Sequence, residues 1–452
     1  GEAGASKKKK KNKKKKKKSQ GAEEAGAADP SALQVQGLEG MNTTLLSQTI
    51  ASLSGDSERI GAGQGISPEA HAFWGTQPMR RDDVPLHQAG PIEPVDKEVM
   101  QEPYKLPPGF HWCTCNVDDD KEMNDVYQLL NENYVEDDDH MFRFDYSHAF
   151  LRWALTPPGY THEWHLGVRA DKSDKLVGFI TGIPATVRAW ERKFQAVEIN
   201  FLCVHKKLRT KRLAPMLIKE VTRRVNCKGI FQAVYTAGAV LPTPVARCRY
   251  YHRSLNPKKL IDVGFSRLAP RMTMPRTLRL YKLPDTPQVP GIKPLELRHV
   301  ASATKLLATH LEKFQLVTHF SESEFAHWFM TRDNVVYTFV VEHPDKPNEV
   351  TDMLSFYSLP STIINNKVYP TLNAAYSFYN VATTCSYIQL LNDALIVARN
   401  HNFDVFNALN ILENEETLKE LKFGIGDGQL QYYLYNWGCP DMEPRQVGLV
   451  LL

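Results

Sequence analysis

The spacing of apolar residues along the chain predicts helices and strands in a regular order. Residues Met123–Tyr134 place Val126, Leu129 and Leu130 on one face at helical spacing, which predicts an amphipathic helix. Two later stretches each predict strand, strand, helix and strand. These elements are Lys175–Ile183, Val197–Val204, Ala214–Val225 and Ile230–Thr236 in the first stretch, and Met353–Leu359, Ala374–Val381, Ser386–Asn400 and Phe403–Leu409 in the second. A helix at Glu413–Leu421 and a strand at Leu430–Tyr435 follow.

The repeated order of elements predicts a mixed α/β (α+β) protein built from two similar halves. Proline-rich residues Pro284–Pro294 form the expected joint between them. We therefore expect an N-terminal half over residues 71–285 and a C-terminal half over residues 286–452.

The first 70 residues differ sharply from the rest of the chain. Eleven lysines lie between Lys7 and Lys18, interrupted only by Asn12. The formal net charge of the chain is +4, so without these eleven lysines the chain would carry −7. Such a low-complexity, charged segment buries too little apolar surface to offset its chain entropy, and we expect residues 1–70 to be a disordered polylysine-containing tail.

Other features of the composition exclude several classes of protein. The apolar runs are too short to cross a bilayer, so we expect no transmembrane segment. The seven cysteines show no CxxC or zinc-ligand spacing, and the nearest pair is Cys113 and Cys115. We interpret them as reduced structural thiols, and we expect no metal site.

A basic loop after one buried strand is the most informative local feature. The strand Val197–Val204 is followed by His205, Lys206, Lys207, Arg209, Lys211 and Arg212, and then directly by a helix with Pro215 in its first turn. The free N–H groups and the positive dipole end of a helix N-terminus attract anions. Taken alone, this pattern is also compatible with a solvated basic loop.

Long motifs in this region and elsewhere resemble those of the N-myristoyltransferases (glycylpeptide N-tetradecanoyltransferases). Residues Glu198–Arg209 resemble the first signature of that family, and residues Lys422–Trp437 resemble the second. Further matching segments are Asn133–Asp139, Phe142–Tyr146, Gln232–Gly238, Ala375–Asn380 and the C-terminal Gly448–Leu452. The resemblance implies two fused Gcn5-related acetyltransferase-like halves with pseudo-twofold symmetry, in agreement with the repeated pattern.

The resemblance implies that myristoyl-CoA is the acyl donor, bound mainly by the N-terminal half. Carried over by position, the residues that bind it are Phe73, Trp74, Phe201, Leu202, Cys203, Val204, Thr210, Arg212, Leu213 and Ala214. Thr210, Arg212, Leu213 and Ala214 are expected to hold the phosphates.

The resemblance also implies an unusual catalytic arrangement. The main-chain N–H groups of Phe201 and Leu202 would hold the thioester oxyanion, and the C-terminal carboxylate of Leu452 would be the base. The sequence offers no convincing serine or cysteine triad, and Cys203 lies in an apolar strand where a packing role is favoured over a nucleophilic one. We therefore expect direct attack of the substrate's glycine amine on the thioester.

The resemblance also implies a peptide groove, formed mainly by the C-terminal half. Its expected residues are Tyr134, Glu136, Asp137, Asp138, Phe142, Phe144, Thr236, Tyr250, His252, Tyr376 and Asp427. Without the resemblance, the acidic run would be interpreted as a solvated face and the lone histidine as structural. The glycine-rich segment Gly424–Gln429 lacks the lysine of a phosphate loop, so we expect a turn that permits close backbone approach.

We expect the partners to be nascent or cleaved proteins that begin with glycine. The lysine tail is expected to bind polyanions, with the ribosome first, an anionic membrane surface second and nuclear import as a further alternative. The expected location is the cytoplasm, in part associated with ribosomes or membranes. The rival interpretations are an acetyl-CoA-dependent N-terminal acetyltransferase and a polybasic RNA-binding protein with an inert acyltransferase fold.

Overall fold

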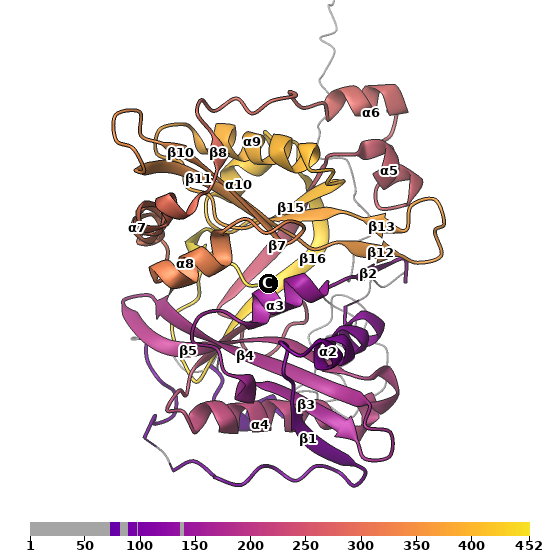
Figure 1. The fold of residues 1–452 in the computed structure, drawn as a ribbon, viewed down its shortest axis with the longest axis vertical. Helices are drawn as coiled ribbons and strands as arrows, with labels where there is room; N and C mark the ends of the chain where they lie inside the picture. The colour runs from indigo at the N-terminus through magenta and orange to yellow at the C-terminus, as the bar shows by residue number, and fades with distance from the viewer. Residues whose placement is uncertain (1–72, 82–88, 97, 136–139) are drawn as a thin grey trace, which may run out of the picture.

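A large mixed β-sheet runs through both halves of the chain (Figure 1). This computed structural model describes residues 73–81, 89–96, 98–135 and 140–452. The N-terminal half supplies β1 (Phe110–Thr114), β3 (His165–Ala170), β4 (Leu176–Ala189), β5 (Arg192–Val204), β6 (Ala233–Ala237) and β7 (Ala246–Ser254). The C-terminal half supplies β8 (Lys293–Pro294), β10 (Val336–Glu342), β11 (Val350–Ser358), β14 (Ala374–Ser377), β15 (Val405–Leu409) and β16 (Gly424–Tyr435).

The order of strands across the sheet reveals the relation between the halves. It reads β1-β3-β4-β5-β6-β16-β7-β15-β14-β11-β10-β8. In each half one neighbouring pair is parallel, β5 with β6 and β14 with β15, and a helix connects its two strands. One strand of each half lies in the sheet of the other half. Strand β16 of the C-terminal half pairs with β6, and β7 of the N-terminal half pairs with β15. The expected pair of similar mixed α/β halves is confirmed, with their final strands exchanged.

Helices cover both faces of this sheet. They are α2 (Asp120–Asn133), α3 (His148–Leu155), α4 (Leu213–Asn226), α5 (Pro257–Asp262), α6 (Met274–Leu280), α7 (Val300–Leu311), α8 (Glu322–Phe329), α9 (Tyr387–Asn400) and α10 (Asn414–Leu418). Helix α2 packs Leu129 and Leu130 into the core that contains Phe201, whereas α4 packs Leu217 and Val221 against the opposite face. The N-terminal sheet is therefore enclosed between α2 and α4.

Short elements complete the fold. Strands β2 (Phe142–Phe144), β12 (Ser361–Ile363) and β13 (Thr371–Leu372) form a small second sheet, and β9 (Leu316–His319) pairs with both β4 and β17 (Val447–Gly448). The 3-10 turns are η3 (Trp74–Thr76), η4 (His162–Trp164), η5 (Lys206–Lys211), η6 (Leu297–His299) and η7 (Pro444–Gln446). Because β2 pairs with β12, this second sheet links the halves through a strand of each.

Most elements expected from periodicity are present, with altered ends. The predicted helix Ser386–Asn400 is α9, and Ser386 is its N-cap in a capping box with Gln389. The predicted strand Ala374–Val381 ends at Ser377, although Val381 still makes a bridge to Met353. The glycine-rich Gly424–Gln429 was expected to form a turn, and this was wrong: it begins β16, with an irregular register against β7. The predicted disordered tail lies outside the described residues.

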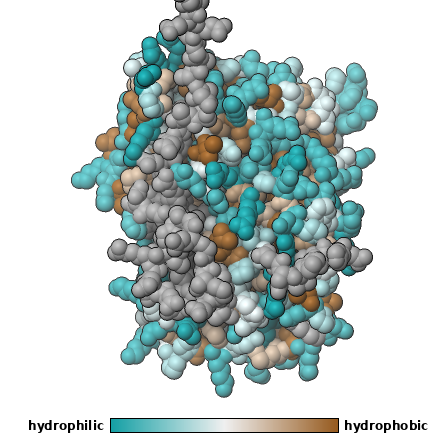
Figure 2. Space-filling view, turned by 180° about the vertical axis from the view of Figure 1, so that it is seen from behind, coloured by the Kyte–Doolittle hydropathy of each residue, from teal (hydrophilic) through white to brown (hydrophobic). Residues whose placement is uncertain are grey.

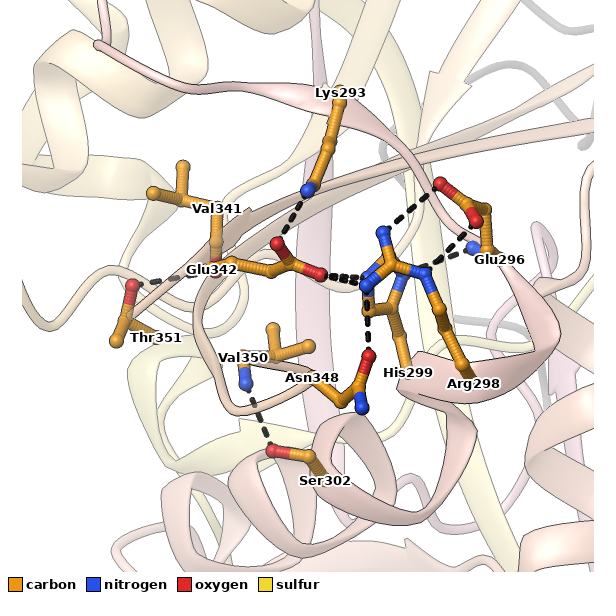
Figure 3. Close-up of polar contacts among 10 residues, drawn as sticks. All are labelled: Lys293, Glu296, Arg298, His299, Ser302, Val341, Glu342, Asn348, Val350 and Thr351. Carbon is orange, nitrogen blue, oxygen red and sulfur yellow. Dashed lines mark hydrogen bonds and ion pairs between the residues drawn. The ribbon is translucent and has the colours of Figure 1, made fainter. Parts of the chain in front are cut away.

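A cluster of charged side chains fixes the start of the C-terminal half (Figure 3). The Glu342 carboxylate at the end of β10 accepts hydrogen bonds from Lys293, Arg298 and His299. Arg298 also donates to Glu296, at 2.9 Å, and to Asn348. The bonds from Lys293 and His299 hold the pKa of Glu342 at about 2. The cluster therefore ties β8 and the start of α7 to the β10–β11 turn.

The outer face of the molecule is mainly polar. Figure 2 shows hydrophilic residues dominating the back face, with apolar residues scattered between them. Within the described ranges, no helix combines the length and apolar character needed to cross a bilayer. The large apolar side chains are gathered inside, where they form three core clusters around the sheet.

Candidate functional site

A β-bulge in β5 is the centre of the candidate site. Asn200 pairs with Thr181 and Cys203 pairs with Phe179, so Phe201 and Leu202 together oppose one residue of β4. Phe201 has a φ of 54°, in the left-handed region that residues with a side chain rarely adopt. Its N–H donates to the side-chain oxygen of Asn200 at 2.8 Å. The bulge therefore turns the Phe201 amide out of the regular ladder.

The C-terminus of the chain ends beside this bulge. The side-chain amide of Asn200 donates to the terminal oxygen of Leu452 at 2.6 Å. The mark for the C-terminus in Figure 1 lies between the two halves of the molecule. The expected catalytic groups of Leu452 and Phe201 are thus linked by one side chain, Asn200, which sequence reasoning did not single out.

Buried tyrosines hold the apolar tail in place. The Val450 N–H donates to the Tyr379 hydroxyl at 3.0 Å, and the Tyr432 hydroxyl donates to the Leu449 carbonyl at 2.9 Å. Leu449, Val450 and Leu451 are buried, and Leu452 is half-buried. Only Val447 and Gly448 form a strand, so the tail is buried mostly as irregular chain.

The surroundings of the tail are poor in water. Burial raises the pKa of Glu198, two residues before Asn200 on β5, to about 8. The same cause raises the pKa of Tyr379. Burial near the tail therefore disfavours the charged forms of these two side chains.

A cavity of about 840 Å³ opens on the other side of the bulge. This volume includes space that is open to solvent. Five of the expected residues line it: Trp74, Tyr134, Phe201, Leu202 and Thr236. The rest of its wall is mostly apolar and comes from β5, α4, β6 and the end of β16, including Ile199, Ile218, Val221, Ala233 and Tyr435.

Aromatic contacts fix the N-terminal side of this cavity. Trp74 stacks on Tyr235 with ring centroids 6.0 Å apart, and Phe73 meets Trp74 edge-on at 5.3 Å. Burial of the Tyr134 hydroxyl raises its pKa, and its ring lies 5.9 Å from that of Phe201. Phe73 itself does not line the cavity but supports Trp74 from outside.

The basic loop leads from β5 into α4 as the sequence predicted. Arg212 has a φ of 55° and no side-chain cap bonds the first N–H groups of α4. Thr210, Lys211 and Arg212 are exposed. Asn133 at the end of α2 anchors the loop, since its side-chain oxygen accepts from the Lys206 N–H at 3.0 Å. An exposed basic loop with uncapped helix N–H groups is suited to bind phosphate.

Other residues expected at the acyl-CoA site are part of the core. Val204, Leu213 and Ala214 are buried in the core cluster that contains Trp74. Cys203 packs against α2 with its sulfur 3.9 Å from the Leu129 carbonyl. Burial raises the pKa of Cys203 to about 12, which agrees with the packing role favoured from the sequence.

A chain of aromatic rings runs from the bulge into the C-terminal half. Centroids lie 5.4 Å apart for Phe201 and Tyr146, 5.8 Å for Tyr146 and Phe144, 6.4 Å for Phe144 and Tyr376, and 6.3 Å for Tyr376 and Tyr250. The structure therefore brings Phe144, Tyr250 and Tyr376 together. Phe142 is fully buried against Phe265, so it supports this wall from behind.

His252 lies at the far end of these rings. It is buried on β7, and Nδ1 shares a 2.7 Å hydrogen bond with the side-chain oxygen of Asn407. Burial lowers its pKa to about 4, so the ring is neutral at neutral pH. A Cβ atom on Gly426 would lie 2.3 Å from Nε2, which explains the glycine there. The exposed Asp427 follows directly and acts on the His252 ring through its charge.

Some expectations cannot be placed. Glu136, Asp137 and Asp138 lie outside the described residues. Within the part of the chain that is described, no group of three or more histidine, cysteine or acidic side chains is arranged to hold a metal ion.

Comparison with known proteins finds relatives that match both halves of the chain. The N-terminal domain described as "Myristoyl-CoA:protein N-myristoyltransferase" matches residues 91–248, and the C-terminal domain of the same description matches residues 262–450. The chain is 56% identical to glycylpeptide N-tetradecanoyltransferase 1 of Arabidopsis thaliana over 85% of its own length and 90% of that protein. It is 54% identical to glycylpeptide N-tetradecanoyltransferase of Drosophila melanogaster, over 84% and 81% of the two chains.

A solved structure has the same fold. The N-myristoyltransferase of Saccharomyces cerevisiae with bound myristoyl-CoA superposes with a TM-score of 0.81 at 40% identity, covering 84% of this chain and 99% of that one. The mixed α/β fold, the apolar cavity at the bulge and these matches over both halves lead to one conclusion. The chain belongs to the myristoyl-CoA:protein N-myristoyltransferase family and is an acyltransferase.

Proposed function

We propose that the protein transfers myristate from myristoyl-CoA to the N-terminal glycine amine of other proteins, by direct attack of that amine on the thioester. The observation that carries this proposal is the 2.6 Å hydrogen bond from Asn200 to Leu452, because it joins the chain terminus to the bulge in β5. A base and two main-chain donors then meet at the mouth of an apolar cavity.

The acyl chain would occupy the apolar cavity, and the phosphates would bind the basic loop. Trp74 and Tyr134 line the cavity at the level of the bulge. The uncapped start of α4 and the exposed Arg212 supply the donors for the phosphates. This arrangement would bring the thioester carbonyl to Phe201 and Leu202.

The main-chain N–H groups of Phe201 and Leu202 would stabilise the oxyanion. The Phe201 N–H donates to the side-chain oxygen of Asn200, so the thioester oxygen must replace or share that acceptor. Loss of one oxyanion donor typically costs about 2.7–4 kcal/mol of barrier. The left-handed conformation of Phe201 holds this N–H in place before the substrate arrives.

The carboxylate of Leu452 would accept the proton of the glycine ammonium. Ordinary pKa values of about 3.5 for a carboxyl and about 8 for an α-amine oppose this transfer by roughly 6 kcal/mol. Burial narrows the gap, because it raises the pKa of the acid and lowers that of the amine. The buried tail and the raised pKa of nearby Glu198 support such an environment.

The peptide would lie along the aromatic chain toward His252 and Asp427. Tyr250 and Tyr376 would form its wall, and Thr236 would lie near the amine, because it lines the cavity beside the bulge. A neutral, buried His252 is suited to hydrogen bonding rather than to general base catalysis. The acidic Glu136, Asp137 and Asp138 would contact basic residues of the peptide.

A transfer assay with a glycine-first peptide tests this function. We expect rapid transfer from myristoyl-CoA, slow transfer from acetyl-CoA and far slower reaction with an alanine-first peptide. Acetyl-CoA as the better donor would favour the rival N-terminal acetyltransferase. Absence of transfer from either donor would favour the inert-fold alternative.

The lysine tail would bind the ribosome. The protein would then be located in the cytoplasm, with part of it associated with ribosomes or membranes. Eleven clustered lysines favour polyanions, with a strong dependence on salt. Deletion of residues 1–20 should abolish cosedimentation with ribosomes and leave peptide transfer intact. Unchanged cosedimentation would exclude this role, and retention on anionic vesicles alone would favour the membrane.

A further inference from the structure

Two cysteines at the far end of the N-terminal sheet share one small space. Cys113 lies on β1 directly opposite Gly167 of β3, and Cys115 follows two residues later. A Cβ atom on Gly167 would lie 2.6 Å from the sulfur of Cys113 and 2.9 Å from that of Cys115. Both sulfur atoms therefore lie next to the same position, where a residue other than glycine at position 167 would place its Cβ atom.

The two thiols differ in exposure and in charge environment. Cys113 is half-buried, whereas Cys115 is only 1% exposed. A hydrogen bond from Cys115 and the nearby Arg169 guanidinium lower the pKa of the Cys113 thiol. The hydrogen bond with Cys113, together with burial, raises the pKa of the Cys115 thiol well above its usual value. One thiol is thus reachable and easily ionised, and its neighbour is enclosed and protonated.

Arg169 is held in position for this effect. It forms a 2.8 Å ion pair with Asp125 of α2, so its charge is fixed between the helix and the thiols. Glu122 of α2 also acts on both sulfurs and opposes Arg169 at Cys113. An accessible thiol of lowered pKa beside a second cysteine is the usual arrangement of a redox-sensitive pair.

We propose that Cys113 and Cys115 form a redox-active pair that hydrogen peroxide converts into an intramolecular disulfide, with Cys113 attacking and Cys115 resolving. The Cys113 thiolate attacks one peroxide oxygen, the O–O bond breaks, and the departing oxygen takes a proton and leaves as water. The sulfur of Cys115 then attacks the Cys113 sulfenic acid, the S–O bond breaks, and a second water leaves with the Cys115 proton. Two electrons pass from the thiols to the peroxide.

Strand geometry makes this disulfide possible and reversible. Same-face neighbours of a strand are about 6.6–6.8 Å apart at the usual rise per residue. That distance is at the upper end of the roughly 4.4–6.8 Å that disulfides span. Cys115 lies just beyond the end of β1, and its N–H still donates to the His165 carbonyl at 2.8 Å. A disulfide at this limit is strained, and strained disulfides are readily reduced.

Peptide mass spectrometry of the full-length protein tests the pair directly. Cleavage after Lys105 and Lys121 releases residues 106–121, which contain both cysteines and no others. After brief treatment with hydrogen peroxide and alkylation of the remaining thiols, we expect this peptide to be unalkylated and lighter by two hydrogen atoms. Dithiothreitol should restore full alkylation. Two free, alkylated thiols in this peptide after treatment would overturn the proposal.

Single variants assign the two roles. In Cys115→Ser, a dicarbonyl probe for sulfenic acid should label Cys113 at least tenfold faster than Cys385. Cys385 is the internal control, because it is also half-buried but its pKa is raised to about 12 by burial and by Asp352. In Cys113→Ser, Cys115 should remain unlabelled. Equal labelling of Cys113 and Cys385, or labelling of Cys115, would refute the assignment, and the wild-type peptide result stands even if a variant misfolds.

Discussion

At the scale of single residues, Asn200 couples two groups that lie far apart in the chain. Its oxygen accepts from the Phe201 N–H and its nitrogen donates to the Leu452 carboxyl oxygen. Both bonds lie at the bulge, which begins directly after Asn200 and turns Phe201 out of the regular ladder. We expect this side chain mainly to orient the terminal carboxylate, although Asn200 also lines the cavity beside the bulge.

Replacing Asn200 with alanine should therefore lower turnover more than acyl-CoA binding. A hydrogen bond to a charged group contributes roughly 1.5–3 kcal/mol, which corresponds to about a 10- to 100-fold loss of kcat. The dissociation constant for acyl-CoA should change less than about threefold. Asn131→Ala on α2 is the matched control, since its side chain bonds only to Tyr127. Equal kcat values for the two variants would exclude the orienting role.

Resemblance located many site residues, but local patterns could not show how they are used. Trp74, expected at the acyl-CoA site, lines the cavity together with Tyr134 and Thr236, which were expected in the peptide groove. Leu213 and Ala214 were expected to hold phosphates, yet their side chains are buried. Asn200 lies within a motif of the resemblance, and a polar residue in a largely apolar strand was a signal of its role. Its role depends on a partner 252 positions later, which no local pattern reveals.

At the scale of elements, periodicity identified strands and helices but not their long-range pairing. The helices α2, α4 and α9 were predicted because each has one continuous apolar face. The exchange of β7 and β16 was not predictable, because it is set by contacts between the halves. The glycines of β16 suggested a turn, whereas they permit a bulged strand to approach His252.

Strand β17 aligns the C-terminal tail, and Gly448 is its critical position. A Cβ atom there would lie 2.8 Å from Cβ of Phe314, too close for a shift of the ring alone to relieve. Gly448→Ala should therefore displace the tail and lower kcat, with little change in acyl-CoA affinity. Gly75→Ala is the control, because a Cβ atom there meets nothing within 4 Å. Unchanged kcat in Gly448→Ala would show that the alignment of the tail by β17 is unimportant.

At the scale of the whole molecule, buried histidines should make stability depend on pH. Burial lowers the pKa of His165, His252 and His327 to about 4, below the ordinary value of 6.5. The unfolded chain therefore binds more protons than the folded one between these values. Stability from these groups is present above pH 6.5 and is lost as the pH falls toward 4. Glu198 opposes this trend, because its raised pKa favours the folded state below pH 8.

The three histidines destabilise the folded state by more than Glu198 stabilises it as the pH falls. The free energy of unfolding should therefore decrease from pH 6.5 to pH 5. The expected slope is about 1.4 kcal/mol per pH unit for each net proton. Urea denaturation at several pH values measures it. His327→Gln should flatten the dependence and Glu198→Gln should steepen it. A free energy of unfolding that stays constant from pH 7.5 to 5 would contradict the assignment of these histidines as buried and neutral.

The central claim is that the chain terminus itself is the base. The most direct measurement is the single-turnover rate of myristoyl transfer in a variant whose C-terminus is extended by two residues, or shortened by Leu451 and Leu452, with acyl-CoA already bound. A general base contributes about 10²–10⁴-fold, so the rate should fall by that factor while acyl-CoA affinity stays unchanged. A variant lacking residues 1–20 should react normally. A near-normal rate in the extended protein would contradict the account.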